Sequence, residues 1–557
     1  MYFEVTYYSE KEVVNLSAKI TEPVSQHIFL FPFRIEPWNK SNELDLSDVF
    51  TKLTRSEWEY EPFSPFASTQ HYNEYGYFHD YVRTALFDKF TNNKEVRVSE
   101  QTTNTDEQLF SNRKPNFVSC LLHRQAQKGV FELWIKGETK TYTLQIDGIS
   151  LRLFETGIAI LAIELLNYSY TDFNDIQLIN DFGRRVYPQF LGSDPGKEME
   201  AVKRAFLADR IVMKISGIDT VEGFKLEDFL ILGNDHLNIG KHITHLMGNE
   251  FTSVYKMAPV IDDRMYTICW YKGGELLSNL IMKGIKDSNP AIHEDSFESS
   301  PDWYRFIFLD GRGCYCPDEH TRRTLIAAST YRRWNQDTSG ISLYGITCYS
   351  LMCLSETDFS RSHMRHQYRL MAELLLAQRS SIINFFFRIS DISHAIDNNL
   401  DFDDIARGVR ILHRDFIGFV NRLWFEEVTP QEQGIEMYIM AMKNMGLEKQ
   451  MNELKSEIKE ISEYVEMQYD KIRADAEEKK SLKMLKLTKM ASYGIFFTIV
   501  LAGWGMSFDF IKSANWLNIF NFICEKPINV GLFILSILIA LIGAKLAIKW
   551  AEKEGNK

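Results

Sequence analysis

The order of apolar and polar residues divides the chain into three kinds of segment. Up to about residue 355, short runs rich in β-branched and aromatic residues are bounded by Gly, Asp or Asn, which is typical of strands and turns. Helices are predicted over Asp172–Phe182 and Lys197–Ala208. Residues 1–355 are therefore expected to form an α/β domain. The predicted strands are Tyr2–Thr6, His27–Phe33, Val130–Ile135, Thr141–Ile146, Ser150–Phe154, Ala159–Leu165, Ile211–Ile215, Met265–Tyr271, Tyr304–Leu309 and Ile341–Thr347.

Helical spacing of apolar residues begins after this domain. The pattern predicts helices over Thr357–Ala395 and Phe402–Phe425, with Asp401 as the N-cap of the second. Pro430 marks a break. Residues 356–433 are therefore expected to form a helical layer.

A heptad pattern follows over residues 434–489. No Pro or Gly interrupts the chain from Leu447 to Ser492, and Gly446 is expected to kink the helix. This segment is predicted to be a coiled-coil stalk, either a spacer or a lever. The seam positions, spaced alternately four and three residues apart, are Leu447, Met451, Leu454, Ile458, Ile461 and Val465.

Two apolar runs lie near the C-terminal end. The first, 490–508, contains no charged residue, and at about 1.5 Å per residue it matches a hydrocarbon core of roughly 30 Å. The second, 528–550, follows a loop over 509–527 and precedes a tail over 551–557. Lysines before the first run and after the second predict two membrane spans with both ends of the chain in the cytoplasm, in a bacterial inner membrane. A buried helical hairpin is the alternative.

Composition limits the classes of partner and cofactor that the chain is expected to bind. The net charge of −12 argues against direct binding of nucleic acid. Seven cysteines, an odd number, argue against a disulfide framework, and Cys314 and Cys316 lack a second pair for zinc. The beginning of the chain shows no cleavable leader. No P-loop or Rossmann fingerprint is present, and the chain is not expected to be an enzyme.

An α/β domain, a long stalk helix, Gly505-Met506-Ser507 at the end of the first apolar run and a second run together resemble the CorA family of divalent-cation channels. In that family the tripeptide is Gly-Met-Asn, so Ser507 puts selectivity for hydrated Mg²⁺ in doubt. The resemblance implies a homo-oligomer, with five subunits as the family precedent. It also implies a weak candidate metal ligand at Asp470, for which a solvated charge is the alternative. The implied pore face contains Met484, Leu487, Ile495, Thr498 and Ala502; Thr498 bonding to its own helix is the alternative.

The large soluble part resembles a branch of CorA-like effectors in type III CRISPR defence, some of which respond to S-adenosylmethionine–AMP conjugates. Candidate ligand contacts are Arg152, which lies between two leucines of a strand, the cationic pair Arg184–Arg185, and Asp219 in a turn after a strand. Arg152 requires an anionic partner, either Glu155 or a ligand phosphate. Internal salt bridges or simple turns explain each candidate equally well.

Three functions remain open from the sequence. The first is a membrane channel gated by a nucleotide second messenger of the S-adenosylmethionine–AMP type, acting as an antiviral effector. The second is a constitutive transporter of Mg²⁺ or another divalent cation. The third is a membrane-anchored enzyme or binding protein.

Overall fold

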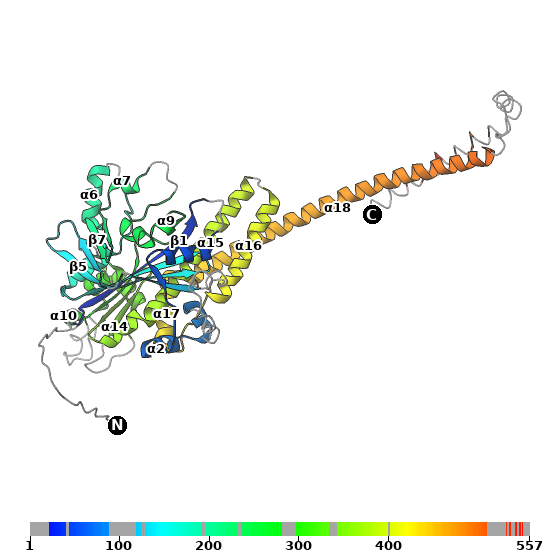
Figure 1. Cartoon of the computed structure of the whole chain (residues 1–557). Coiled ribbons are helices and arrows are strands. Elements are labelled where there is room, and N and C mark those ends of the chain that lie inside the picture. The colour runs from blue at the N-terminus through cyan, green and yellow to red at the C-terminus, as the bar shows by residue number, and fades with distance from the viewer. Residues whose placement is uncertain are drawn as a thin grey trace, which may run out of the picture. The chain divides into compact units, whose positions relative to one another are not determined.

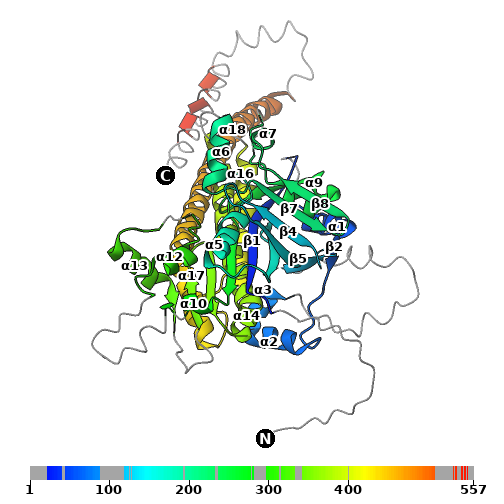
Figure 2. The same cartoon turned by 90° about the vertical axis from the view of Figure 1, so that its left-hand side faces the viewer.

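A computed structural model of the chain (Figures 1 and 2) gives the arrangement of its elements. The residues that it describes are 22–39, 44–87, 118–124, 126, 128–191, 195–231, 236–277, 279–280, 297–312, 315–332, 342–398 and 401–508, with isolated positions between 531 and 549.

One 13-stranded sheet organises the described α/β part of the chain. Its main path runs β11-β12-β13-β10-β1-β6-β5-β4-β7-β8, with β2 and β3 joined beside β5 and β9 beside β1. All pairings are antiparallel except that of β10 with β13. The strands are β1 (Ser25–Pro37), β2 (Trp58–Tyr60), β3 (Val118–His123), β4 (Val130–Trp134), β5 (Thr141–Phe154), β6 (Ile158–Asn167), β7 (Arg210–Ile215), β8 (Ile218–Glu222), β9 (Tyr255–Pro259), β10 (Tyr266–Tyr271), β11 (Thr330–Tyr331), β12 (Ser342–Ile346) and β13 (Ser350–Ser355).

Helices cover both faces of the sheet at its centre, which is why every residue of β6 is buried. On one face, His27 of β1 contacts Asn180 of helix α5. On the other face, Arg34 of β1 reaches Asn384 of helix α15, because successive side chains of a strand point to opposite faces. The smaller helices are α1 (Leu46–Arg55), α2 (Thr69–Tyr77), α3 (Asp80–Leu86), α5 (Phe173–Gly183), α6 (Pro195–Ala205), α7 (Leu226–Phe229), α8 (Lys241–Thr244), α9 (Asn249–Thr252), α10 (Gly274–Leu277), α12 (Pro301–Phe308) and α13 (Glu319–Ser329), with a 3₁₀ turn at His245–Met247.

The predicted helical layer is present as α14 (Asp358–Arg365), α15 (Gln367–Asp397) and α16 (Phe402–Arg422), followed by α17 (Glu432–Met445). Asp401 caps α16 as predicted, accepting a hydrogen bond from the Asp403 amide. Gly446 ends a helix, whereas the sequence predicted only a kink there. It adopts a left-handed conformation, with φ of 68°, and separates α17 from α18 (Leu447–Phe508).

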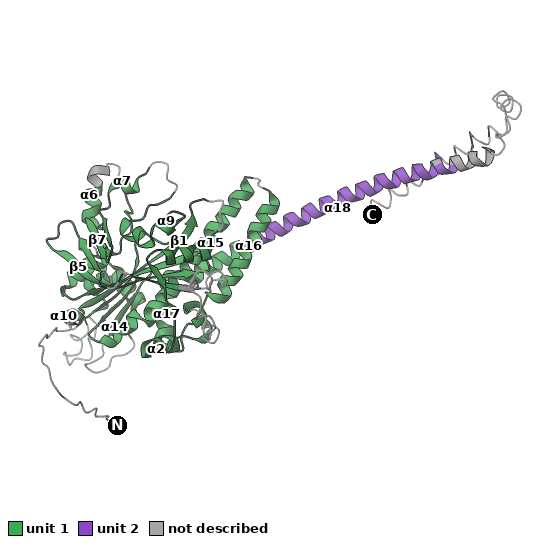
Figure 3. Ribbon diagram, viewed as in Figure 1, with its two compact units in different colours: residues 1–458 green, residues 459–557 purple. Residues whose placement is uncertain are grey.

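Two compact units divide the chain at Ile458 (Figure 3). In the first unit, the seam residues Leu447, Met451 and Leu454 are at most 1% exposed, so they pack within the chain rather than against another copy. In the second unit, Val465 is buried and Ile472 is half exposed.

The prediction of two membrane spans is wrong for the described part of the chain, where no helix combines the length and the apolarity needed to cross a membrane. Most of 528–550 lies outside the described residues, as do the loop 509–527 and the tail 551–557. The CorA-like two-span fold, the ion-channel assignment and the inner-membrane localisation are corrected with the spans.

Most predicted strands and helices of the α/β part are confirmed, with two exceptions. Tyr304–Leu309 was expected to be a strand but belongs to α12 and its C-cap, because Trp303, Phe306 and Ile307 bury one helical face after an N-cap at Ser300. The two strands predicted over Thr141–Ile146 and Ser150–Phe154 are instead parts of one long strand, β5, which shifts register between Ile146 and Gly148. The predicted strand Tyr2–Thr6 lies outside the described residues.

Candidate functional site

Arg152 lies near the end of β5, where its neighbours Leu151 and Leu153 are buried. Its carboxylate partner is not Glu155, which lies beside Arg422. Its Nε lies 2.5 Å from Glu373 Oε2 of α15, and its Nη1 donates to the Leu86 carbonyl at 2.8 Å. The side chains of Arg152 and Glu373 are 12% and 1% exposed, so this ion pair is nearly removed from water. The anion that Arg152 requires therefore comes from the chain itself.

Two further arginines extend this pair into a network. Arg369 of α15 donates Nε to Glu373 at 2.8 Å and Nη2 to the Ser150 hydroxyl at 2.6 Å, and its Nη1 pairs with Glu164 of β6. Arg365, at the end of α14, donates Nε to Glu164 at 3.0 Å and pairs through Nη2 with Asp147 at 2.5 Å. The network thus joins β5 and β6 to α14 and α15.

Mutual attraction keeps Glu164 and Arg369 charged. Burial alone would raise the pKa of Glu164, but the charges and hydrogen bonds of Arg369 and Arg365 outweigh it and hold that pKa below its ordinary value. Burial alone would lower the pKa of Arg369, and Glu164 and Glu373 raise it instead. Glu164 and Arg369 therefore stay ionised together at neutral pH.

This network forms one wall of a cavity of about 250 Å³, named here the arginine cavity. The ring of Phe63 stacks on Phe87 with centroids 4.0 Å apart and supplies an aromatic surface. His366 lies 2.8 Å from Glu74, beside Gln70. The charged and aromatic residues that line the cavity are Glu61, Phe63, His71, Glu74, Phe87, Arg152, Glu164, Arg365, His366 and Arg369.

The lining favours binding over covalent chemistry. Cys120 faces the cavity, but burial raises the pKa of its thiol against the attraction of Arg152, so it is protonated and a poor nucleophile. The Ser150 hydroxyl accepts a hydrogen bond from Arg369. Among the described residues, no group of three or more His, Cys, Asp and Glu is placed to hold a metal ion. Charges of both signs beside stacked rings suit a ligand that carries both charges and a planar group.

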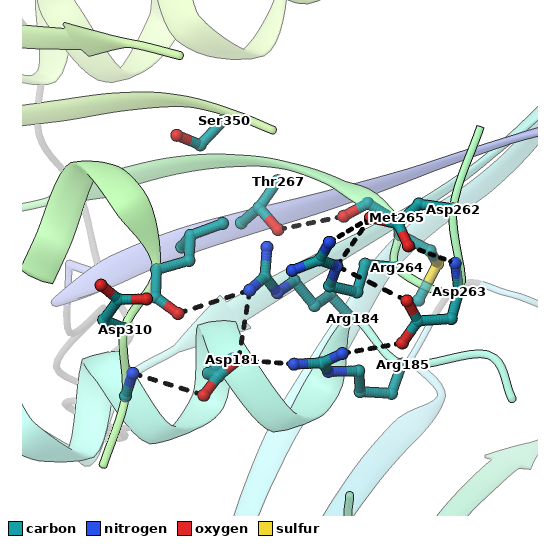
Figure 4. A network of polar contacts seen from close by, with 12 residues as sticks. Asp181, Arg184, Arg185, Asp262, Asp263, Arg264, Met265, Thr267, Asp310 and Ser350 are labelled. Atoms are coloured by element: carbon teal, nitrogen blue, oxygen red, sulfur yellow. Dashed lines mark hydrogen bonds and ion pairs between the residues drawn. The ribbon is translucent and has the colours of Figure 1, made fainter. Parts of the chain in front are cut away.

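The structure does not bring the other predicted ligand residues to this cavity. Arg184 and Arg185 follow α5 and enter a separate buried network (Figure 4). Arg184 donates to Asp181 at 3.2 Å, and Arg185 donates to Asp263 at 2.7 Å. Burial lowers the pKa of Arg184 to about 10, which leaves it charged at neutral pH. Internal carboxylates therefore pair with both arginines, while Arg184 Nε and Nη1 and Arg185 Nε make no hydrogen bond within the described part of the chain.

Asp219 is exposed on β8, opposite Lys214 of β7. Three strand steps separate β8 from β5 in the sheet, about 14 Å at the usual strand spacing. Asp219 therefore does not line the arginine cavity.

The residues predicted for a pore lie on α18. Met484, Leu487 and Ile495 are exposed, and Asp470 is an exposed side chain of the same helix. The Thr498 hydroxyl donates to the Gly494 carbonyl at 2.8 Å, so it bonds to the preceding turn of its own helix. The side chains of Ala502, Gly505, Met506 and Ser507 lie outside the described residues.

Arg365, Arg369 and Glu373 were missed from the sequence. They lie in the predicted helical layer, where charged residues are ordinarily exposed. The available signal was the spacing of Arg369 and Glu373, four residues apart in an otherwise apolar stretch of helix.

Comparisons with protein-family models, curated proteins and solved structures find no match to this chain. The functional reading therefore depends on the geometry of the site.

Proposed function

We propose that the chain is a ligand sensor, whose α/β part binds a nucleotide-like molecule in the arginine cavity. The observation that carries the proposal is that three arginines from β5, α14 and α15 open onto one cavity beside the stacked rings of Phe63 and Phe87. The proposed ligand belongs to the class expected from the sequence, a nucleotide conjugate that carries both an anionic phosphate and a cationic part. The proposal does not include a membrane pore.

Unused hydrogen-bond donors support an anionic contact. Within the described part of the chain, Arg152 Nη2 and Arg365 Nη1 make no hydrogen bond, and the Arg365 side chain is 34% exposed. A guanidinium offers five N–H donors in a planar fork that matches phosphate oxygens. Glu61 and Glu74 offer acceptors to the cationic part or to a ribose.

Stability alone also does not explain why this network of buried charges is present. A buried ion network costs desolvation, and replacing it with apolar residues is often neutral or stabilising. Charged groups with shifted pKa values that open onto a cavity are therefore better explained by ligand recognition.

Helix α15 is the proposed connection to the rest of the first unit. Arg369 lies at its cavity end, and further along, Gln378 donates to the Leu423 carbonyl at 2.9 Å and to the Tyr438 hydroxyl of α17 at 3.0 Å. A ligand acts through such a helix only by binding two arrangements of it with different affinity.

Calorimetric titration of the full chain tests the proposal. S-adenosylmethionine–AMP, cyclic oligoadenylates and ATP are titrated against the wild type and Arg365→Gln. The variant loses one charge-assisted hydrogen bond, about 1.5–3 kcal/mol, so its Kd is expected to rise roughly 10- to 100-fold.

Two variants serve as controls. Arg361→Gln removes an arginine one helical turn away on α14, which pairs with Asp358 and does not line the cavity. Asp219→Ala removes the predicted contact on β8. Both are expected to bind like the wild type. Absence of binding by every nucleotide, or equal weakening by Arg361→Gln, would refute the proposal.

Self-association through α18 remains a separate proposal. The seam within the first unit is buried in the chain, so only positions after Ile458, with Ile472 49% exposed, are available to another copy. Mass measurement in solution with Ile472→Lys tests it, and a wild-type monomer would end it.

A further inference from the structure

A second cavity, of about 450 Å³, lies where α15 and α16 meet the turn between β5 and β6, and is named here the α15–α16 cavity. Its volume falls within the roughly 300–1,000 Å³ of small-molecule sites. Its apolar side includes Phe385 of α15 and Phe419 of α16, whose ring centroids are 5.5 Å apart. The two helices pack together and are seen side by side in Figure 1. The cavity is thus built on rigid elements.

Three arginines surround this apolar side, and two carboxylates face them. Arg388 Nη2 donates to Asp415 Oδ2 at 2.8 Å, and Arg414 donates from Nε and Nη2 to Asp415 Oδ1 at 3.1 and 3.0 Å. Arg422 Nη2 lies 3.4 Å from Glu155 Oε2. Three guanidinium groups against two carboxylates leave one positive charge in excess at the cavity.

Arg388 and Arg414 share the single carboxylate of Asp415, so some of their N–H donors remain available. Within the described part of the chain, Arg388 Nε and Nη1 and Arg414 Nη1 make no hydrogen bond. Burial raises the pKa of Glu155, and Asp415 raises it further against the attraction of Arg422. An incoming dianion therefore meets free N–H groups of Arg388 and Arg414.

Gly418 keeps the cavity open. It lies on α16 midway between Arg414 and Arg422, four residues from each, so all three face the same side of the helix. A Cβ at Gly418 would come within 2.6 Å of Arg422 Nη2 and displace that guanidinium. Glycine is unfavourable inside a helix, and here its absent side chain leaves room for the arginine that lines the cavity.

We propose that the α15–α16 cavity is an oxyanion site for a small molecule that carries a pyrophosphate group. Two adjacent phosphates can be held by Arg388 and Arg414 at one side and by Arg422 at the other. Planar guanidinium forks bind phosphate oxygens in pairs, whereas a single orthophosphate reaches only one side. This site is separate from the arginine cavity and does not depend on the nucleotide proposal.

The test is calorimetric titration of the full chain with inorganic pyrophosphate and, separately, orthophosphate. Pyrophosphate is expected to bind at least 10-fold tighter. Gly418→Ala is expected to weaken pyrophosphate about 10-fold while raising the melting temperature. Gly408→Ala is the matched control: it lies on the same helix, and its Cβ meets only Ile392, at 3.8 Å, so it should raise the melting temperature and leave binding unchanged.

A second pair of variants separates charge from shape. Arg414, whose side chain is 75% exposed, is changed to Gln, with Arg407→Gln, 65% exposed on the same helix, as its control. Only Arg414→Gln should weaken pyrophosphate. If Arg365→Gln and not Arg414→Gln weakens pyrophosphate binding, the anion occupies the arginine cavity instead and the inference is overturned. Absence of pyrophosphate binding, or equal binding by Gly418→Ala and Gly408→Ala, would overturn the inference.

Discussion

Glu373→Gln is the sharpest test of the buried charge network. The glutamate is 1% exposed and accepts from Arg369 Nε at 2.8 Å while it faces Arg152 Nε at 2.5 Å. The amide keeps the shape of the side chain and removes its charge. Arg369 retains Glu164, but Arg152 loses its carboxylate partner.

The expected cost follows from that geometry. Removing one partner of a buried ion pair typically costs about 3–5 kcal/mol, because the other charge stays buried and unpaired. Glu319→Gln is the matched control, since Glu319 also pairs with an arginine four residues away, at 3.0 Å, but is 62% exposed. An exposed pair of this kind is worth less than about 1 kcal/mol.

Guanidinium denaturation followed by tryptophan fluorescence measures the difference, because Trp58, Trp270 and Trp303 are buried in the first unit. The double variant Arg152→Met, Glu373→Leu replaces both charges by apolar groups and should recover most of the lost stability. A loss under about 1 kcal/mol for Glu373→Gln, equal to that of the control, would show that water screens the network and would refute the reasoning.

Three further predictions concern stability. Burial lowers the pKa of His27 from 6.5 to about 4, against its hydrogen bond to Asn180. The unfolded chain therefore takes up a proton below pH 6.5 and the folded chain only near pH 4, so His27 should lower the free energy of unfolding by about 3 kcal/mol at pH 4. His27→Gln should flatten the pH dependence of denaturation. Burial raises the pKa of Asp310 from 3.8 to about 6, and the Asp181 charge adds to it. Stability from its neutral form is present below pH 3.8 and is lost as pH rises through 6. After a discount for solvent screening, Asp310→Asn should stabilise the chain by roughly 1–2 kcal/mol at pH 7 and little at about pH 3.5, and equal effects at both would contradict this. Gly446→Ala should lower the free energy of unfolding by about 1 kcal/mol because of its φ of 68°, whereas Gly494→Ala, in open space on α18, should not, as thermal melts can show.

Patterns of apolar residues predicted local elements well where one period dominated. The strand His27–Phe33 lies inside β1, and Phe402–Phe425 contains all of α16. The pattern failed at Tyr304–Leu309, where aromatic content suggested a strand although Trp303, Phe306 and Ile307 follow helical spacing. Composition and period conflicted there, and the period was the better guide.

The apolar run 490–508 failed for a different reason. Its length, its lack of charge and the flanking lysines predicted a membrane span, but no described helix is long and apolar enough to cross a membrane. Apolar residues also serve as contacts between protein segments, so an apolar run does not by itself specify its surroundings.

The partner of Arg152 shows what one sequence leaves out of a site. The requirement for an anion was correct, since a guanidinium in an apolar strand is costly to bury alone. Its source was 221 residues away, on a helix that no local pattern ties to β5. The same holds for Arg184 and Arg185, whose carboxylates come from α5 and from Asp263. A buried arginine is therefore evidence for a carboxylate first. It becomes evidence for a ligand only where unused N–H donors open onto a cavity, as at Arg365 and Arg388, and those two residues rather than Arg152 are where binding experiments discriminate best.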